Sequence, residues 1–300
     1  MSNLSSWISA ARLRTLPLSI SGIIVGSAIA AHSGYFDIAI FSLALGTTLG
    51  LQILSNFAND YGDGVKGTDN DERIGPARAI QSGLITQKDM KMAMVVTAIT
   101  TLLMAVLLIY ASFGSEKLLS ALFFFVLGIA AIIAAIKYTV GDSAYGYRGM
   151  GDIFVFIFFG LVAVYGSYYL YGHDHQLIGV FPAIAIGFLS VAVLNLNNLR
   201  DRISDEKSGK MTLVVKLGER QAKNYHYLLI LGALMCLLVY SVITSKELND
   251  FIYILAFIPL IFHLNRVVTN KDPRNLDPEL KIVALSTFGI ALLFGLGLIW

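Results

Sequence analysis

Two groups of Asn and Asp side chains stand at the ends of long apolar stretches in this sequence of 300 residues. The first group contains Asn56, Asn59, Asp60 and Asp63, at spacings of i, i+3, i+4 and i+7. If the preceding stretch is a helix that continues through these residues, all four side chains lie on one face. That face would bring several side-chain oxygen atoms close together.

The second group follows a later apolar stretch and contains Asn198, Asp201 and Asp205. These residues also share one face of a helix, because they are three and four positions apart. The two groups stand at corresponding ends of their helices. We therefore predict that the two acidic faces can point toward each other across a bundle of helices.

Carboxylates that converge at a membrane boundary repel each other, and each costs about 2.5–3.5 kcal/mol at a helix centre and less near the interface. A divalent cation would remove this cost. Mg2+ prefers hard oxygen ligands and typically uses one or two carboxylates together with phosphate oxygens of a substrate. We therefore predict Mg2+ ions that bridge to a diphosphate. The predicted ligands are Asn59, Asp60, Asp63, Asp201 and Asp205.

Basic residues near both groups could neutralise the remaining phosphate charge, and Arg can form two parallel hydrogen bonds with it. The alternative is that the Asn and Asp residues are solvated helix caps. Asp at the C-terminal end of a helix, however, has the wrong sign for the helix dipole. The sequence has no Cys/His zinc pattern, P-loop or dinucleotide-binding glycine pattern. The basic residues are Lys66, Arg78, Arg148, Arg200 and Lys210.

The composition predicts which elements position these residues. Apolar residues make up 56% of the chain, charged residues only 14%, and the mean hydropathy is +0.70. A soluble domain carries about a quarter charged residues. Eight charge-free stretches are long enough to cross a bilayer core of about 30 Å, and a ninth of intermediate length can borrow from its flanks. These stretches cover residues 15–36, 38–59, 92–115, 118–136, 153–173, 175–199, 224–245, 251–265 and 282–300.

The sequence therefore predicts an all-α membrane protein with nine transmembrane helices in a single domain, residues 1–300. Lys and Arg gather in alternate connecting segments, except for Lys117 and Lys246. Because basic residues are enriched in cytoplasmic loops, we expect a cytoplasmic N-terminus and a C-terminus outside. The net charge of only +2 does not indicate a nucleic-acid-binding surface. The predicted active-site loops are residues 59–91, 137–152 and 197–223.

The two acidic groups resemble the two aspartate-rich motifs of UbiA-type intramembrane prenyltransferases, which follow the second and sixth of nine helices. The family often has a third acid where this chain has Gly67, and the next acid here is Asp69. The fuller pattern resembles the branch of the family that acts on 1,4-dihydroxy-2-naphthoate in menaquinone synthesis. The stretches that carry this resemblance are Leu13 to Pro17, Gly75 to Arg78, Tyr145 to Asp152, and Asn198 to Leu213.

The resemblance implies transfer of a polyprenyl group from polyprenyl diphosphate to 1,4-dihydroxy-2-naphthoate, with loss of CO2, which gives demethylmenaquinone. It implies Mg2+ as the cofactor and a multi-pass protein of the bacterial cytoplasmic (inner) membrane, surrounded by the lipid bilayer. The alternatives are another acceptor (4-hydroxybenzoate, homogentisate or haem) and, from a different class of function, a secondary transporter. The implied catalytic residues are Asp60, Asp63, Asp201, Asp205 and Tyr138.

We expect the aromatic acceptor near Lys137 and Tyr138, where the fourth helix meets the cytoplasm. A Tyr could bind the substrate or stabilise an allylic cation through its ring, but Tyr and Lys also serve as interfacial anchors. Arg14 could bind carboxylate or diphosphate, or it could only help to set the orientation of the protein in the membrane. The predicted substrate-binding residues are Arg14, Asn56, Asn59, Lys66, Arg78, Lys137, Tyr145, Arg148, Asn198, Arg200 and Lys210.

An isoprenoid tail also requires an apolar slot, and two groups of aromatic residues are candidates for its lining. Ordinary packing or contact with lipid is the alternative for each of them. The five His residues lie near helix ends without the spacing of metal ligands, so we expect them to be structural. The candidate aromatic residues are Phe123, Phe124, Phe125, Phe154, Phe156, Phe158 and Phe159.

Overall fold

The computed structural model describes residues 4–67, 78–172, 176–244 and 247–300. Within these residues, nine helical segments are long and apolar enough to cross a membrane, and no strand is present. The predicted all-α architecture with nine spans is therefore confirmed for the described part of the chain.

The first span contains α1 (Leu4–Ala11), η1 (Leu13–Thr15) and α2 (Leu16–His32). The fifth span is irregular, because α6 (Gly151–Val155) passes into an 11-residue π-helix, η3 (Phe156–Gly166), before α7 (Ser167–Gly172). The connection before it contains the short helix η2 (Tyr145–Arg148). The other spans are formed by α3 (Ile38–Lys66), α4 (Gln87–Phe113), α5 (Leu118–Lys137), η4 (Leu177–Gly179) with α8 (Val180–Lys207), α9 (Leu213–Thr244), η5 (Leu248–Phe257) with α10 (Ile258–Thr269), and η6 (Pro273–Leu276) with α11 (Asp277–Ile299).

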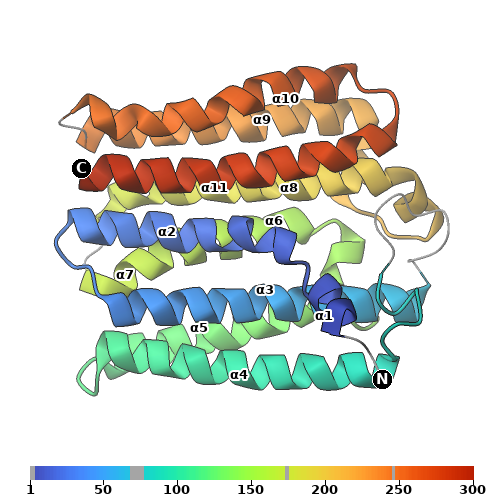
Figure 1. Cartoon of the computed structure of the whole chain (residues 1–300), viewed down its shortest axis with the longest axis horizontal. Coiled ribbons are helices and arrows are strands. Elements are labelled where there is room, and N and C mark those ends of the chain that lie inside the picture. The colour runs from blue at the N-terminus through green and yellow to red at the C-terminus, as the bar shows by residue number, and fades with distance from the viewer. Residues whose placement is uncertain (1–3, 68–77, 173–175, 245–246) are drawn as a thin grey trace.

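The helices run roughly along one direction, and the two termini lie at opposite ends of the bundle (Figure 1). The spans that contain α2, α8 and α11 are the most buried. In their most apolar 18-residue segments, 61%, 56% and 56% of the residues are buried inside the protein. Helices α3, α4 and α5 lie on one side of this centre, and α9 and α10 lie on the other (Figure 1). The C-terminal ends of α3, α5 and α8 lie at the same end of the bundle (Figure 1).

Several helices continue beyond the charge-free stretches that predicted them. Helix α3 extends to Lys66 instead of residue 59, α8 extends to Lys207, and α9 already begins at Leu213. The connecting segments 59–91 and 197–223 are therefore partly helical, which corrects their prediction as loops. The reason is that a charge ends an apolar stretch but does not interrupt the hydrogen bonds of the helical backbone. As a consequence, both Asn/Asp groups lie on helices.

Candidate active site

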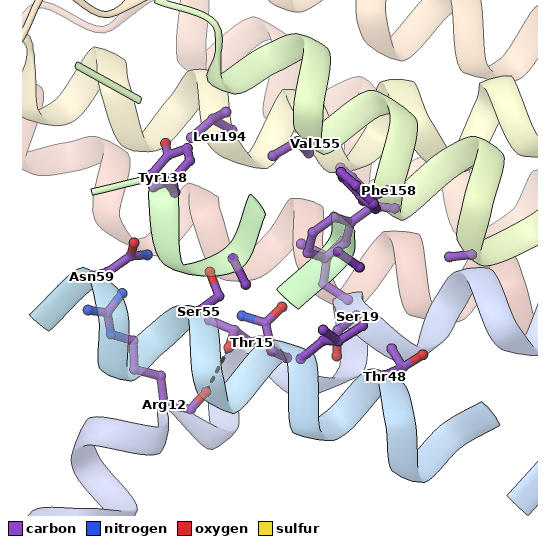
Figure 2. Close-up of a pocket in the computed structure, with 18 of the residues that line it drawn as sticks. Arg12, Thr15, Ser19, Thr48, Ser55, Asn59, Tyr138, Val155, Phe158 and Leu194 are labelled. Atoms are coloured by element: carbon purple, nitrogen blue, oxygen red, sulfur yellow. Dashed lines mark hydrogen bonds between the residues drawn. The ribbon is translucent and has the colours of Figure 1, made fainter. Parts of the chain in front are cut away.

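A cavity of about 890 Å3 opens between α2, α3, α5, α6, η3, α8 and α11. One end is polar and contains Arg12, Asn59 and Tyr138, whereas Phe158 lies toward the other end (Figure 2). The cavity therefore joins a charged region to an apolar one. Nine of the predicted site residues line it, namely Arg14, Asn59, Asp60, Asp63, Arg78, Tyr138, Tyr145, Arg200 and Lys210.

The α3 wall of the cavity presents the carboxylates of Asp60 and Asp63, each of which is only 2% exposed. Both carboxylates contact Arg78, which places Nη1 2.8 Å from Oδ1 of Asp60 and Nη2 3.4 Å from Oδ2 of Asp63. Arg12 forms a second ion pair with Asp60. Two buried acids are thus balanced by cations from two separate connecting segments.

Arg12 was not predicted as a site residue, although it stands two positions before Arg14. It adopts the left-handed conformation (φ 51°, ψ 58°), which is uncommon for a residue other than Gly. Trp7 of α1 packs edge-on against Phe57 of α3, at 5.7 Å between ring centroids. Asn56 Nδ2 donates to the carbonyl oxygen of Ala11 at 2.8 Å. These contacts fix the N-terminal segment on α3, so that Asn56 is buried as an anchor outside the cavity lining.

The α8 wall presents basic and amide groups instead of carboxylates. Asn197 and Arg200 line the cavity, whereas Asn198, Asp201 and Asp205 are buried outside its lining. Arg200 Nε and Nη2 donate to the two oxygens of Asp201 at 2.8 and 2.7 Å. Its Nη1 donates to Asp277 at 2.6 Å. The predicted face of α8 that carries Asn198, Asp201 and Asp205 therefore does not line the cavity. The cation Arg200 lines it instead.

Lys210 reaches the cavity because the chain turns sharply after α8. Gly209 has φ +75°, a conformation that favours glycine, and the backbone N–H of Lys210 donates to the carbonyl of Asp205 at 2.8 Å. The Lys210 Nζ lies 3.6 Å from Oδ1 of Asp205. Burial lowers the pKa of Lys210, but the nearby carboxylates of Asp63 and Asp205 outweigh this and raise it. Lys210 is therefore a charged link between the α3 and α8 groups.

Tyr147 is a second residue that is missing from the predicted site residues, although it stands in the matched stretch from Tyr145 to Asp152. Its hydroxyl donates to Oδ1 of Asp63 at 2.8 Å. The Lys66 ammonium lies 3.9 Å from the centre of its ring, and that of Lys210 lies 5.5 Å away. Lys66 itself is exposed and does not line the cavity, so its contact with the site passes through Tyr147.

Tyr138 follows the last residue of α5, as predicted, and lines the cavity near Asn59 (Figure 2). The turn after α5 lies close to α3. Gly62 permits this approach, because a Cβ at this position would lie only 2.7 Å from the carbonyl oxygen of Thr139. Thr139 Oγ1 also donates to the carbonyl oxygen of Ala58 at 2.8 Å. Burial, followed by the charges of nearby carboxylates, raises the pKa of Tyr138, so that its hydroxyl stays protonated.

Tyr145 packs on Phe154 with ring centroids 3.9 Å apart and meets Tyr138 edge-on at 5.3 Å. Its hydroxyl donates to the carbonyl oxygen of Ala134 at 2.8 Å. Lys137 and Arg148 are exposed and do not line the cavity. Asp69 lies outside the described residues.

At the apolar end, the predicted aromatic residues divide between the cavity and other surroundings. Phe124, Phe154, Phe158 and Phe159 line the cavity. Phe123 is 62% exposed, and Phe156 packs against Phe188 at 5.4 Å between ring centroids. The lining thus combines residues of α5, α6 and the π-helix η3.

Metal-binding groups do not converge in this arrangement. Among the described residues, no group of three or more His, Cys, Asp or Glu side chains is placed to hold a metal ion. The chemistry of the donors nevertheless fits Mg2+, because the available ligands are carboxylate and amide oxygens. One of them, Oδ2 of Asp205, is buried and has no hydrogen-bond partner among the described residues.

Two histidines form a separate buried network on the far side of α8. His226 Nε2 and His263 Nε2 are 2.7 Å apart, and His263 Nδ1 lies 2.6 Å from Oε2 of Glu279. Glu279 is also paired with Arg266. This network joins α9, α10 and α11, and its residues do not line the cavity.

Residues 19–296 match the UbiA prenyltransferase family. The chain is 43% identical to 1,4-dihydroxy-2-naphthoate octaprenyltransferase of Escherichia coli (strain K12), over 99% of this chain and 96% of that protein. An apo structure of a UbiA homolog from Aeropyrum pernix K1 superposes with a TM-score of 0.71 at 15% identity, covering 96% of this chain and 98% of that one. A UbiA homolog from Archaeoglobus fulgidus bound to GPP and Mg2+ gives a TM-score of 0.68 at 17% identity, covering 98% and 99%.

Proposed function

Since this chain belongs to the UbiA prenyltransferase family, we propose that its cavity holds a polyprenyl diphosphate, with the diphosphate at the polar end. The enzyme prenylates 1,4-dihydroxy-2-naphthoate in menaquinone biosynthesis. The observation that carries the placement of its substrate is one continuous cavity that joins the α3 carboxylates to an aromatic, apolar lining. This shape matches a molecule with a highly charged head and a hydrocarbon tail.

The cations of the polar end are placed to bind the diphosphate. Arg12, Arg78 and Lys210 line the cavity and contact carboxylates of the chain. Phosphate oxygens can replace these carboxylates as partners, and Arg forms two parallel hydrogen bonds with phosphate. The buried carboxylates would then be left with a surplus of negative charge. A divalent cation would balance this surplus.

The residues that would hold Mg2+ are Asn59, Asp60 and Asp63 on the α3 wall, with Asp201 and Asp205 of α8. The α8 acids would become available when Arg200 and Lys210 exchange them for phosphate oxygens. Bound Mg2+ supplies electrostatic stabilisation of the departing diphosphate. The UbiA homolog from Archaeoglobus fulgidus that carries GPP and Mg2+ supports Mg2+ as the cofactor.

The transfer step exchanges one bond for another at the allylic carbon of the prenyl group and at the ring carbon that carries the carboxylate. The bond between the allylic carbon and the diphosphate oxygen breaks, and the leaving diphosphate retains the electron pair. The electron-rich naphthoate ring forms a new bond to the allylic carbon. The carboxylate then leaves as CO2, and its bonding electrons restore the aromatic ring. Tyr138, which lines the cavity as a neutral phenol, is placed to stabilise the allylic cation through its ring.

We place the protein in the bacterial cytoplasmic membrane with the N-terminus and the polar end of the cavity on the cytoplasmic side. The distribution of Lys and Arg supports this orientation. The whole chain then acts as one prenyltransferase domain, and its cavity is lined by residues from the spans that contain α2, α3, α4, α5, η3, α8 and α11. In this orientation the isoprenoid tail lies within the depth of the bilayer.

The experiment that tests this function is an assay of the purified protein in detergent. It would receive Mg2+, a polyprenyl diphosphate and either 1,4-dihydroxy-2-naphthoate or 4-hydroxybenzoate. We expect demethylmenaquinol, the reduced form of demethylmenaquinone, from the naphthoate and no product from the benzoate. A product from the benzoate alone would overturn the choice of acceptor, and the absence of both products would overturn the function.

A further inference from the structure

One wall of the cavity is formed partly by α11, where no site residue was predicted. Asp277, Lys281 and Ala284 occupy positions i, i+4 and i+7 of this helix and all line the cavity. Leu280 lines it as well. Helix α11 therefore turns one face toward the cavity, with Lys281 as the cation of that face.

Most cations that line the cavity contact acids of the chain. Arg12 and Arg78 bind the α3 carboxylates, Arg200 binds Asp201 and Asp277, and Lys210 faces Asp205. Lys281 differs, because no ion pair within the described residues involves it. Its side chain is exposed at the cavity.

The cavity that Lys281 lines also offers groups that suit an aromatic acid. Asn197 of α8 and Ser19 of α2 line the same cavity and offer polar groups for ring hydroxyls. Leu18 and Leu280 also line it, from α2 and α11, and offer apolar contact for a fused ring. Helices α2 and α11 pack extensively against each other, so their residues belong to one wall.

The reaction brings two anions into this cavity, a diphosphate and an aryl carboxylate. The cations grouped around the α3 and α8 acids serve the first of these. We propose that Lys281, with Arg14 of η1, the short helix that directly precedes α2, forms the subsite that binds the carboxylate of the aromatic acceptor. This inference rests on the proposed function, to which it adds the residue that recognises the acceptor. The ammonium orients the ring and is not consumed, because the carboxylate leaves as CO2 only after the new carbon–carbon bond has formed.

The test compares wild type with Lys281→Met in steady-state assays. We expect the KM for 1,4-dihydroxy-2-naphthoate to rise about tenfold, which is the effect of losing one charge-assisted contact. The KM for the polyprenyl diphosphate should stay unchanged. The inhibition constant of 1-naphthol, which has no carboxylate, should also stay unchanged. Lys281→Arg should restore most of the affinity for the naphthoate.

A matched control is Lys88→Met, because Lys88 is an exposed lysine in the first turn of α4 that does not line the cavity. It should leave all three constants unchanged. An unchanged KM for the naphthoate in Lys281→Met would overturn the proposal, and so would an equal weakening of 1-naphthol. A raised KM for the diphosphate alone would assign Lys281 to the other substrate and also overturn it. Failure of the proposed function would be seen separately, as a wild-type enzyme that makes no product from the naphthoate.

Discussion

The two Asn/Asp groups have similar sequences but opposite relations to the cavity. On α3, the carboxylates of Asp60 and Asp63 line the cavity, and their cations come from distant parts of the chain. On α8, Arg200 lines the cavity, and the carboxylate to which it donates two hydrogen bonds belongs to the next residue, Asp201. The α3 wall thus offers negative charge to a ligand, whereas the α8 wall offers positive charge.

This difference teaches that similar motifs can serve different parts of one ligand. A Mg2+ ion would meet the α3 carboxylates first, whereas phosphate oxygens would meet Arg200 and Lys210 first. Substitutions on the two walls should therefore have different consequences. Loss of an α3 acid should act mainly on the reaction, and loss of an α8 acid should act on both the reaction and the stability of the protein.

The largest effect should follow from Asp63→Asn. We expect prenyl transfer to fall by about a thousandfold or more, because one carboxylate near the departing diphosphate is lost. Product formation per inserted protein in membranes would measure this. Asp142→Asn, at an exposed position in the connection after α5, is the control and should keep its activity. Retained transfer in Asp63→Asn would contradict the assignment of the α3 wall.

A smaller effect on the reaction, with a larger one on stability, should follow from Asp201→Asn. Removing the partner of a buried charge costs about 3–5 kcal/mol. Arg200 is 2% exposed but keeps Asp277, so we expect a smaller loss. Thermal unfolding in detergent should show a lower Tm, together with a fall in transfer of about tenfold to a hundredfold. Glu206→Gln, at an exposed position of the same helix, should change neither quantity.

A further step down is Tyr147→Phe, which removes the hydroxyl that donates to Asp63 but keeps the ring beside Lys66. A hydrogen bond to a charged group contributes about 1.5–3 kcal/mol, so we expect kcat to fall by about tenfold. Single-turnover assays at saturating substrates would measure it. The same loss in Tyr227→Phe, whose ring lies outside the cavity, would show that the effect is not specific to Asp63.

The smallest effect concerns pH, and it compares wild type with Lys210→Met. Because the carboxylates of Asp63 and Asp205 raise the pKa of Lys210 above 10.5, its stabilising contribution is complete below pH 10.5. It is lost as the pH rises through the raised value. The difference in Tm between wild type and variant should therefore be constant from neutral pH upward and shrink only above 10.5. A difference that already shrinks near neutral pH would contradict the charged state of Lys210.

The sequence predicted the architecture well because long charge-free stretches leave few alternatives to membrane-spanning helices. It also placed Asn59, Asp60 and Asp63 on one face, since helical periodicity is a local property. For α8, the same reasoning did not predict that the acids lie outside the cavity lining in this structure. Periodicity grouped Asn198, Asp201 and Asp205, but it cannot tell which face of a helix turns toward a cavity that other helices form.

Residues that belong to the site through long-range packing were the ones that the sequence missed. Arg12 reaches Asp60 only because α1 lies on α3, and Lys281 reaches the cavity only because α11 packs beside α2. The contact between His226 and His263 likewise depends on the packing of α9 and α10. None of these neighbours shares a local spacing pattern.

The ion pair between Arg12 and Asp60 also has a consequence for biogenesis. The two residues are 48 positions apart, and Arg12 leaves the ribosome first. A counter-ion for the acidic end of α3 is therefore already present in the preceding segment when α3 is synthesised, whereas Arg78 follows α3 in the chain. On α8, Arg200 precedes Asp201 directly. For each acidic helix end, one cation that pairs with the carboxylates is thus synthesised before them.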